Sequence, residues 1–293
     1  MSFCLGIDAG GSHTRARLAD DHGEVIGIGS AGPANTRIGL DNAIAEIENA
    51  CREAITSAGL DEGKVASIRA GIGIAGLNRT GVLGGLREHP FSFASLAVAS
   101  DAAIACLGAH HGKDGAIVIV GTGSIGFARV GDETVVIGGY GFPISDEGSG
   151  ADLGLHAIRR SLWARDGRIQ PTPMTEEILD RFSGSPGEIV GWMDHATATD
   201  YAMFAPLVMD HAARGDGVAE PIVQEAARRI DRLIRSLLER GAPSCCLMGG
   251  LSGRLHDWLA AGIRERLREP LGDALDGAIR LAQIRGLPPG RTE

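Results

Sequence analysis

Apolar and polar positions follow two different periods along the chain, and the changes of period predict its architecture. Residues 3–8 are a nearly continuous apolar run that ends in an acid, which is typical of a buried strand. Residues 15–19 and 25–28 read as two more strands with Gly23 as the turn between them, which indicates an antiparallel meander. A helical period of apolar residues then covers residues 41–58, so the first long helix is expected there.

After this helix the chain alternates strands and helices, and then the opening pattern returns. Residues 67–74 and 96–99 predict two strands, and Asp101 begins a helix of small residues. Residues 116–120 are a β-branched run that ends at a glycine-rich turn, and two short strands are expected within 125–137. A strand, a glycine-rich turn and two strands thus occur twice. We therefore expect a tandem duplication of one α/β unit, with a ligand cleft between the copies.

The remainder of the chain is predicted to be mostly helical. The clearest helix covers residues 220–240, and a short strand over 244–248 ends at Gly249 and Gly250. The proline-containing segments 171–173 and 183–186 are interpreted as surface loops.

Composition limits the partners of this chain. The formal net charge of −9 argues against non-specific binding to nucleic acid or to an anionic membrane surface. Phosphate ligands remain open, because backbone amides and a divalent metal can hold them. The start of the chain has no targeting pattern, and no apolar run is long enough to span a bilayer. Five cysteines without a C-x-x-C spacing favour a reducing cytoplasm and show no zinc or iron–sulfur motif.

Two glycine-rich turns follow apolar strands in equivalent places. Asp8 ends the first strand and precedes Gly10, Gly11 and Ser12, and the second turn is the Gly-Thr-Gly-Ser segment 121–124. Glycine lets backbone N–H groups approach an anion, and a carboxylate at a strand end can hold hydrated Mg²⁺ against phosphates. Each turn alone could be an ordinary β-turn, but the pair predicts a phosphate clamp. Neither is a P-loop, and the first does not open a helix as a dinucleotide fold requires.

Two acidic features could carry chemistry. Asp101 suits a helix N-cap, and the alternative is a general base that takes a proton from an attacking hydroxyl; one aspartate could serve both roles. The segment 138–150 carries two acids among glycines and apolar residues. Burying such a loop is costly unless the carboxylates meet polar partners such as sugar hydroxyls, and a solvent-exposed turn is the alternative.

These segments together resemble a known family. Residues 6–12, 120–124 and 139–150 are similar to the N-acetylglucosamine kinase and BadF/BcrA-type branch of the actin-like ATPase superfamily. Further similarity is spread nearly from end to end, at residues 89–91, 105–110, 142–146, 246–249 and 257–259. The resemblance implies an α/β fold of two ribonuclease-H-like domains flanking a nucleotide cleft. The implied domains are residues 1–110, with the C-terminal helix 273–293 as a candidate addition, and residues 111–272.

The resemblance also implies roles for individual residues. ATP would be bound by three motifs, formed by Asp8, Gly10, Gly11, Ser12, Thr14, Gly121, Thr122, Gly123, Ser124, Gly249 and Gly250. Asp8 would hold Mg²⁺ through water, and Asp101 would be the catalytic base and a sugar contact. The other implied sugar contacts are Asn35, Tyr140, Asp146 and Glu147.

The implied reaction is ATP-dependent phosphorylation of glucosamine to glucosamine 6-phosphate. N-acetylglucosamine is the alternative substrate, although Tyr140 stands where N-acetylglucosamine kinases often carry tryptophan. A second departure from the family is Ser12, which stands where threonine is usual and keeps the hydroxyl. An ATP-driven activase is the alternative of a different class, but its bridging cysteines have no counterpart here. A sugar-sensing regulator is disfavoured by the acidic charge and by the lack of a DNA-binding segment. The resemblance to this family also implies a homodimer.

Overall fold

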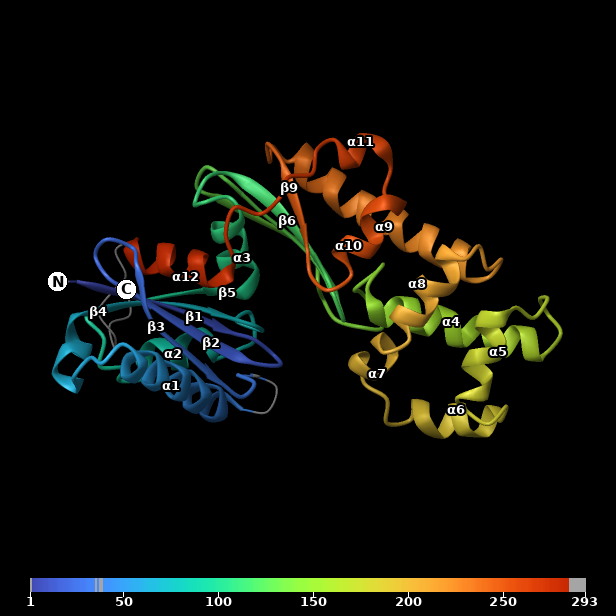
Figure 1. Ribbon diagram of the computed structural model, residues 1–293, viewed down its shortest axis with the longest axis horizontal. Helices are drawn as coiled ribbons and strands as arrows, with labels where there is room; N and C mark the ends of the chain where they lie inside the picture. Colours follow the sequence, from blue (N-terminus) through green and yellow to red (C-terminus); the bar gives the residue numbers. More distant parts are fainter. Residues whose placement is uncertain (1, 35, 37–38, 285–293) are drawn as a thin grey trace. The chain divides into compact units, whose positions relative to one another are not determined.

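A computed structural model of the chain (Figure 1) describes residues 2–34, 36 and 39–284. The chain divides into two compact units. Unit 2 is Ala116–Arg268, and unit 1 consists of the chain before and after it.

Unit 1 is built on a five-stranded sheet of order β3-β2-β1-β4-β5. The strands are β1 (Phe3–Ala9), β2 (Thr14–Ala19), β3 (Val25–Ala31), β4 (Ile68–Ile74) and β5 (Ser95–Ser100). The first three form the antiparallel meander that the sequence predicts, while β4 pairs in parallel with both β1 and β5. The carboxyl ends of the parallel strands therefore meet at one edge, where ligands usually bind in such sheets.

Helices cover both faces of this sheet (Figure 1). They are α1 (Leu40–Ser57), α2 (Val82–Glu88), α3 (Asp101–Ala109) and α12 (Ala274–Gln283), with a short 3₁₀ helix over Glu62–Ser67. The apolar stripe of α1, including Ile47 and Ala54, is buried against β1 to β3, as its helical period predicts. On the opposite face, α12 packs against α3, β1 and β4.

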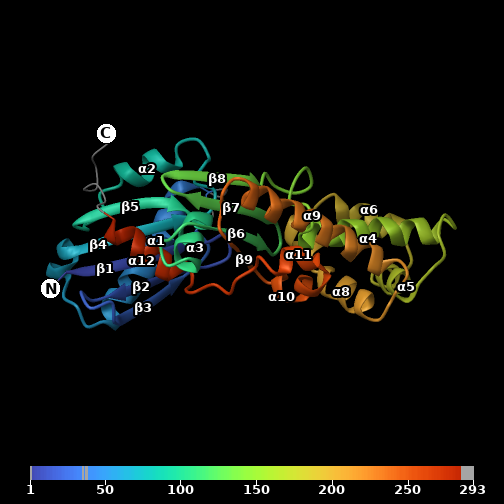
Figure 2. The ribbon, with the colours of Figure 1, turned by 90° about the horizontal axis from the view of Figure 1, so that it is seen from above.

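The helices α3 and α12 approach each other so closely that their backbones touch. A Cβ atom built on Gly277 would overlap the backbone oxygen of Ile104, and one built on Gly108 would overlap that of Asp273. Figure 2 shows the two helices side by side. Arg17 on β2 adds two ion pairs to the start of α12, with Asp273 at 2.7 Å and Asp276 at 2.6 Å. The last described helix is thus fixed to the first strands of the chain.

Unit 2 repeats the sheet of unit 1 with one strand fewer. Its strands are β6 (Gly115–Val120), β7 (Ser124–Val130), β8 (Glu133–Gly138) and β9 (Cys245–Met248), in the order β8-β7-β6-β9. This order matches β3-β2-β1-β4, with β6 in the place of β1 and β9 parallel to it. The duplicated α/β fold predicted from the sequence is confirmed.

The helices of unit 2 lie mostly between β8 and β9 in the chain. They are α4 (Gly150–Arg165), α5 (Pro173–Asp180), α6 (Pro186–Met193), α7 (Ala198–Ala202), α8 (Ala205–Ala213), α9 (Ala219–Glu239), α10 (Ser252–Leu255) and α11 (Ala261–Arg264), with a 3₁₀ turn over His256–Trp258. Among the described residues, no helix combines the length and apolar character needed to cross a bilayer.

The loop assignment of the two proline-containing segments is wrong in part. Pro173 and Pro186 are the first residues of α5 and α6, and the side chains of Thr172 and Ser185 cap these helices. Proline suits the first helical turn because its missing N–H would have no helical partner there.

Candidate active site

The first part of the candidate site lies at the carboxyl edge of the unit 1 sheet. Asp8 is near the end of β1, its side chain is 16% exposed, and Arg15 donates to its Oδ2 at 2.6 Å. The following turn is closed by the Gly10 N–H, which donates to the His13 carbonyl at 3.0 Å. Ser12 at the tip is exposed, and no described heavy atom lies within 4 Å of a Cβ built on Gly11. The tip is therefore open to an anion.

Asp101 begins α3 directly after β5, at the same edge of the sheet. The N-cap interpretation of this residue is wrong by one position, because the Ser100 hydroxyl accepts the capping hydrogen bond from the Ala103 N–H at 3.1 Å. The Asp101 Oδ1 accepts from the Ala102 N–H at 2.9 Å. Burial raises the pKa of Asp101; the Ala102 N–H opposes this rise, and the charge of Asp8 adds to it. The two carboxylates are thus close enough to interact.

Thr14 lies below this edge and has no surface for a ligand. Its side chain is fully buried, and its hydroxyl donates to the Gly32 carbonyl at 2.8 Å. The Ala34 N–H donates to the Gly10 carbonyl at 3.1 Å, so the segment after β3 is tied to the glycine turn. Asn35, which follows, lies outside the described residues.

The second part of the candidate site lies in unit 2, at the ends of β6 and β9. The turn after β6 is held to the start of α4, because the Gly150 N–H donates to the Gly121 carbonyl at 2.8 Å and the Ala151 N–H to the Thr122 carbonyl at 3.1 Å. Gly249 and Gly250 follow β9, the parallel neighbour of β6, and are exposed. The structure therefore brings these two sequence motifs together.

Gly249 is required for this arrangement. Its φ is +97°, and a Cβ there would overlap the backbone oxygen of Val120. Only glycine adopts such a conformation at no steric cost.

The loop over residues 139–149, called here the acidic loop, joins β8 to α4. Asp146 is 9% exposed and has φ +67°. Burial raises the pKa of Asp146, and the backbone N–H groups of Ser124, Gly141 and Phe142 oppose the rise. Asp146 is thus buried with polar partners from the backbone, and its contact with sugar hydroxyls stays a prediction.

The other predicted residues near the acidic loop differ in exposure. Tyr140 is 79% exposed and Glu147 is exposed. Ser124 is only 3% exposed and its hydroxyl donates to the Glu147 carbonyl at 2.8 Å, so this serine holds the loop. Ile144, whose apolar character argues against an exposed turn, is nevertheless 85% exposed.

Two residues that support the acidic loop, Asp152 and Arg229, were not predicted from the sequence. The Asp152 Oδ2 accepts from the Gly148 N–H at 2.8 Å and from Arg229 at 2.9 Å. Burial alone would raise the pKa of Asp152, but hydrogen bonds from His156 and Gly148, together with the charge of Arg229, lower it. Asp152 and Arg229 are 77 positions apart, and neither belongs to a motif, so no local signal could have paired them.

The residues at the unit 1 edge fit a hydrated magnesium ion. Among the described residues, no group of three or more His, Cys, Asp or Glu side chains is arranged to hold a metal. Magnesium does not need such a group, because it keeps most of its waters and is commonly reached through one or two carboxylates and the substrate phosphates. Asp8 and Asp101 provide two interacting carboxylates beside an open glycine turn.

The fold and the three glycine motifs define a duplicated α/β protein of the nucleotide-binding ATPase class. Each unit carries a glycine turn after its first strand, and unit 2 adds a glycine pair after β9. The chain belongs to the BadF/BadG/BcrA/BcrD ATPase family, which it matches over residues 5–279. It therefore uses ATP.

Three proteins to which the chain is similar carry the names of sugar kinases. The chain is 36% identical over 282 residues to the glucosamine kinase GspK of Vibrio cholerae, and the match covers 96% of both chains. It is 28% identical over 247 residues to an N-acetylmuramic acid/N-acetylglucosamine kinase of Clostridium acetobutylicum, covering 82% of this chain and 80% of the other. A crystal structure from Chromobacterium violaceum, described as a proposed N-acetylglucosamine kinase, matches with a TM-score of 0.88 and 33% identity over 97% of this chain and 99% of that one.

Proposed function

We propose that the protein is a cytoplasmic glucosamine kinase, which transfers the γ-phosphoryl group of ATP to the 6-hydroxyl of glucosamine. The observation that carries the proposal is Asp101, a half-buried carboxylate with a raised pKa beside Asp8 and the first glycine turn. The end-to-end identity with a glucosamine kinase supports the choice of sugar. All five cysteines are buried and none forms a disulfide in the described part of the chain, which suits a reducing cytoplasm.

Asp101 acts as the general base in this proposal. It accepts the proton of the 6-hydroxyl, the oxygen forms a bond to the γ-phosphorus, and the bond between that phosphorus and the β–γ bridging oxygen breaks, so that ADP leaves. A raised pKa makes the carboxylate a stronger proton acceptor than an exposed aspartate would be. The position of Asp101 directly at the junction of β5 and α3 supports the role, since positioning is most of what phosphoryl transfer requires.

Backbone amides are assigned most of the phosphate binding. In unit 1 the amides of Gly11 and Ser12 are assigned to phosphate, and in unit 2 those of Thr122 and Gly123. The N–H groups of Gly10 and Gly121 instead close their own turns, donating to the His13 carbonyl at 3.0 Å and to the Gly123 carbonyl at 2.9 Å. Gly249 and Gly250 are assigned to the adenosine. Asp8 would hold Mg²⁺ through water, and the ion would neutralise charge on the phosphates.

Sugar binding is assigned to the acidic loop and to Asn35. The buried carboxylate of Asp146 can accept hydrogen bonds from sugar hydroxyls, and the exposed Glu147 can attract the ammonium group of glucosamine. Tyr140 has an accessible ring that can contact the sugar, because its side chain is 79% exposed. Thr14 and Ser124 are assigned supporting roles only, because their hydroxyls donate to backbone carbonyls.

A panel of sugars tests the proposal. ADP release would be measured with glucosamine, N-acetylglucosamine, N-acetylmuramic acid, glucose and no sugar. The expected result is turnover with glucosamine well above all others. Turnover with N-acetylglucosamine alone would keep the mechanism and replace the substrate. Equal ADP release without sugar would contradict a kinase and favour an ATP-driven activase.

The raised pKa of Asp101 predicts the pH dependence of the reaction. A general base must be ionised, so kcat/KM for glucosamine is expected to rise with pH on the acid side. The midpoint of this rise should lie above the ordinary aspartate value of about 3.9, because burial favours the protonated form. The measurement is a pH profile of kcat/KM with saturating ATP. A profile that is flat down to the ordinary aspartate pKa would contradict the prediction.

A further inference from the structure

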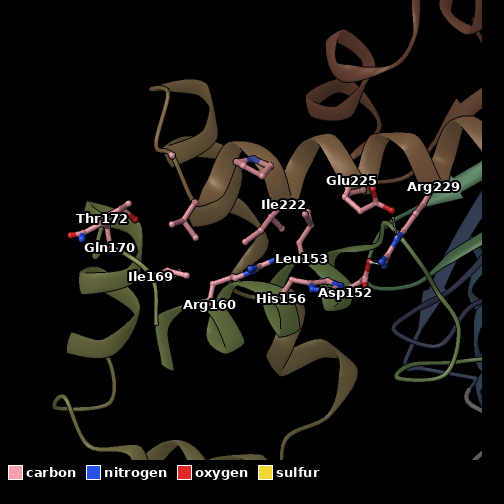
Figure 3. A pocket seen from close by; sticks show the side chains of 14 residues that line it. Asp152, Leu153, His156, Arg160, Ile169, Gln170, Thr172, Ile222, Glu225 and Arg229 are labelled. Carbon is pink, nitrogen blue, oxygen red and sulfur yellow. Dashed lines mark hydrogen bonds and ion pairs between the residues drawn. The ribbon is translucent and has the colours of Figure 1, made fainter. Parts of the chain in front are cut away.

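A cavity of about 530 Å³ lies within unit 2, between α4 and α9 (Figure 3). Its size is within the range of small-molecule sites, which is about 300–1,000 Å³. Leu153 of α4 and Ile222 of α9 contribute to an apolar lining, together with Ile169 and Pro221. None of the residues assigned to ATP or to the sugar lines it.

The two arginines that line this cavity differ in whether a carboxylate neutralises them. Arg229 is paired with two carboxylates of the lining, Asp152 at 2.9 Å and Glu225 at 3.2 Å. Arg160, in contrast, forms no ion pair with a carboxylate in the described part of the chain, and its guanidinium lies 4.4 Å from the centre of the Trp163 ring. Figure 3 shows its side chain rising from α4 into the space below Ile222.

Arg160 and the apolar lining residues together indicate the kind of ligand. An unpaired guanidinium is a donor for two parallel hydrogen bonds to a planar anion such as a carboxylate. The stack on Trp163 orients this group before a ligand arrives, which lowers the entropy lost on binding. The apolar residues of the lining match an aromatic or branched aliphatic body, while polar lining residues such as His156, Gln170 and Thr172 can contact the polar end of a ligand.

We propose that the cavity between α4 and α9 is a second binding site, for a small organic anion with an apolar body, held by Arg160. Asp152 and Glu225, the two acids of the lining, both form ion pairs with Arg229, and this reduces their repulsion of a bound anion. Arg160 is the anchor, and Leu153 and Ile222 contact the apolar body.

The probe for the test is 1-anilinonaphthalene-8-sulfonate, an aromatic anion that fluoresces in apolar surroundings. The full-length protein would be titrated with ADP and glucosamine present in excess, to occupy the proposed active site. Saturable binding with one site is expected. Arg160→Gln should weaken it by about tenfold, because a hydrogen bond to a charged group is lost. Arg168→Gln should leave it unchanged, since Arg168 lies 4.5 Å from the same Trp163 ring but does not line the cavity.

A second variant fills the cavity. No described heavy atom lies within 4 Å of a Cβ built on Gly217, which lines the cavity, so Gly217→Phe can add a ring without a clash at its Cβ. It is expected to abolish saturable binding while kinase activity and melting temperature stay unchanged. The proposal is overturned if saturable binding is absent with ADP and glucosamine in excess, or if Arg160→Gln and Arg168→Gln weaken it equally.

Discussion

Replacing Asp101 with asparagine is expected to lower kcat for glucosamine by about 10²- to 10⁴-fold, the usual contribution of a general base. Asparagine has nearly the same shape and keeps an oxygen that can accept the Ala102 N–H, which now donates to the Asp101 Oδ1 at 2.9 Å. The substitution therefore removes the proton acceptor and leaves α3 intact. The KM for ATP should change little, because the nucleotide is assigned to other residues.

The same substitution is expected to preserve or raise stability. The folded-state pKa of Asp101 is raised, so the folded protein binds the proton more tightly than the unfolded chain does. Its contribution to stability is therefore present at low pH and is lost as the pH rises through the raised pKa. At neutral pH the buried charge opposes folding, and a neutral amide removes this cost.

The two effects are measured on one preparation. Steady-state kinetics gives kcat, and thermal unfolding at pH 7 gives the melting temperature. Activity that collapses while the melting temperature holds supports the catalytic assignment. Wild-type activity in Asp101→Asn would contradict it, and loss of activity together with unfolding would indicate a structural role instead.

Replacing Gly277 with alanine is expected to destabilise unit 1 by about 3 kcal/mol, at the upper end of typical overpacking costs. The added Cβ would overlap the Ile104 backbone oxygen, and neither backbone can move without separating α12 from α3. Helix propensity alone predicts the opposite sign, since alanine is favoured over glycine by about 1 kcal/mol inside a helix. The sign of the effect thus decides between packing and propensity.

Gly84→Ala is the matched control. Gly84 lies in α2 of the same unit, and no described atom is within 4 Å of a Cβ built there, so a small gain in stability is expected. A chain of two units need not unfold in one step. Urea dependence of amide hydrogen exchange, resolved by peptide, reads unit 1 separately from unit 2. A Gly277→Ala variant as stable as Gly84→Ala would contradict the close backbone contact.

Elements with strong periodicity were predictable from the sequence. The apolar run of β1 and the long amphipathic helix α9 appear within one or two residues of their expected bounds, because burial on one or both faces dictates their composition. Both glycine turns were also predictable, because a backbone that closely approaches another backbone or a ligand has no room for a Cβ atom, and glycine has none.

The starts of three helices each differ by one residue from the sequence prediction: Ser100 and not Asp101 caps α3, and Pro173 and Pro186, the last residues of the predicted loops, begin α5 and α6. Local patterns do not fix a helix end to a single residue.

Interactions between distant segments were not predictable. The burial of Asp146 and the exposure of Ile144 depend on how the acidic loop folds over β7 and α9. The contact between Asp152 and Arg229 is formed only when α4 and α9 pack together.

The return of α12 to the first sheet has a consequence for synthesis of the protein on the ribosome. Unit 2 is one continuous segment and can fold as soon as it has emerged. Unit 1 is interrupted, and the face of β1 and β4 that α12 covers stays bare until α12 leaves the exit tunnel. The N-terminal strands are made early, but their sheet is covered only once α12 has been made, so a chain terminated before α12 would leave this face of unit 1 exposed to aggregation.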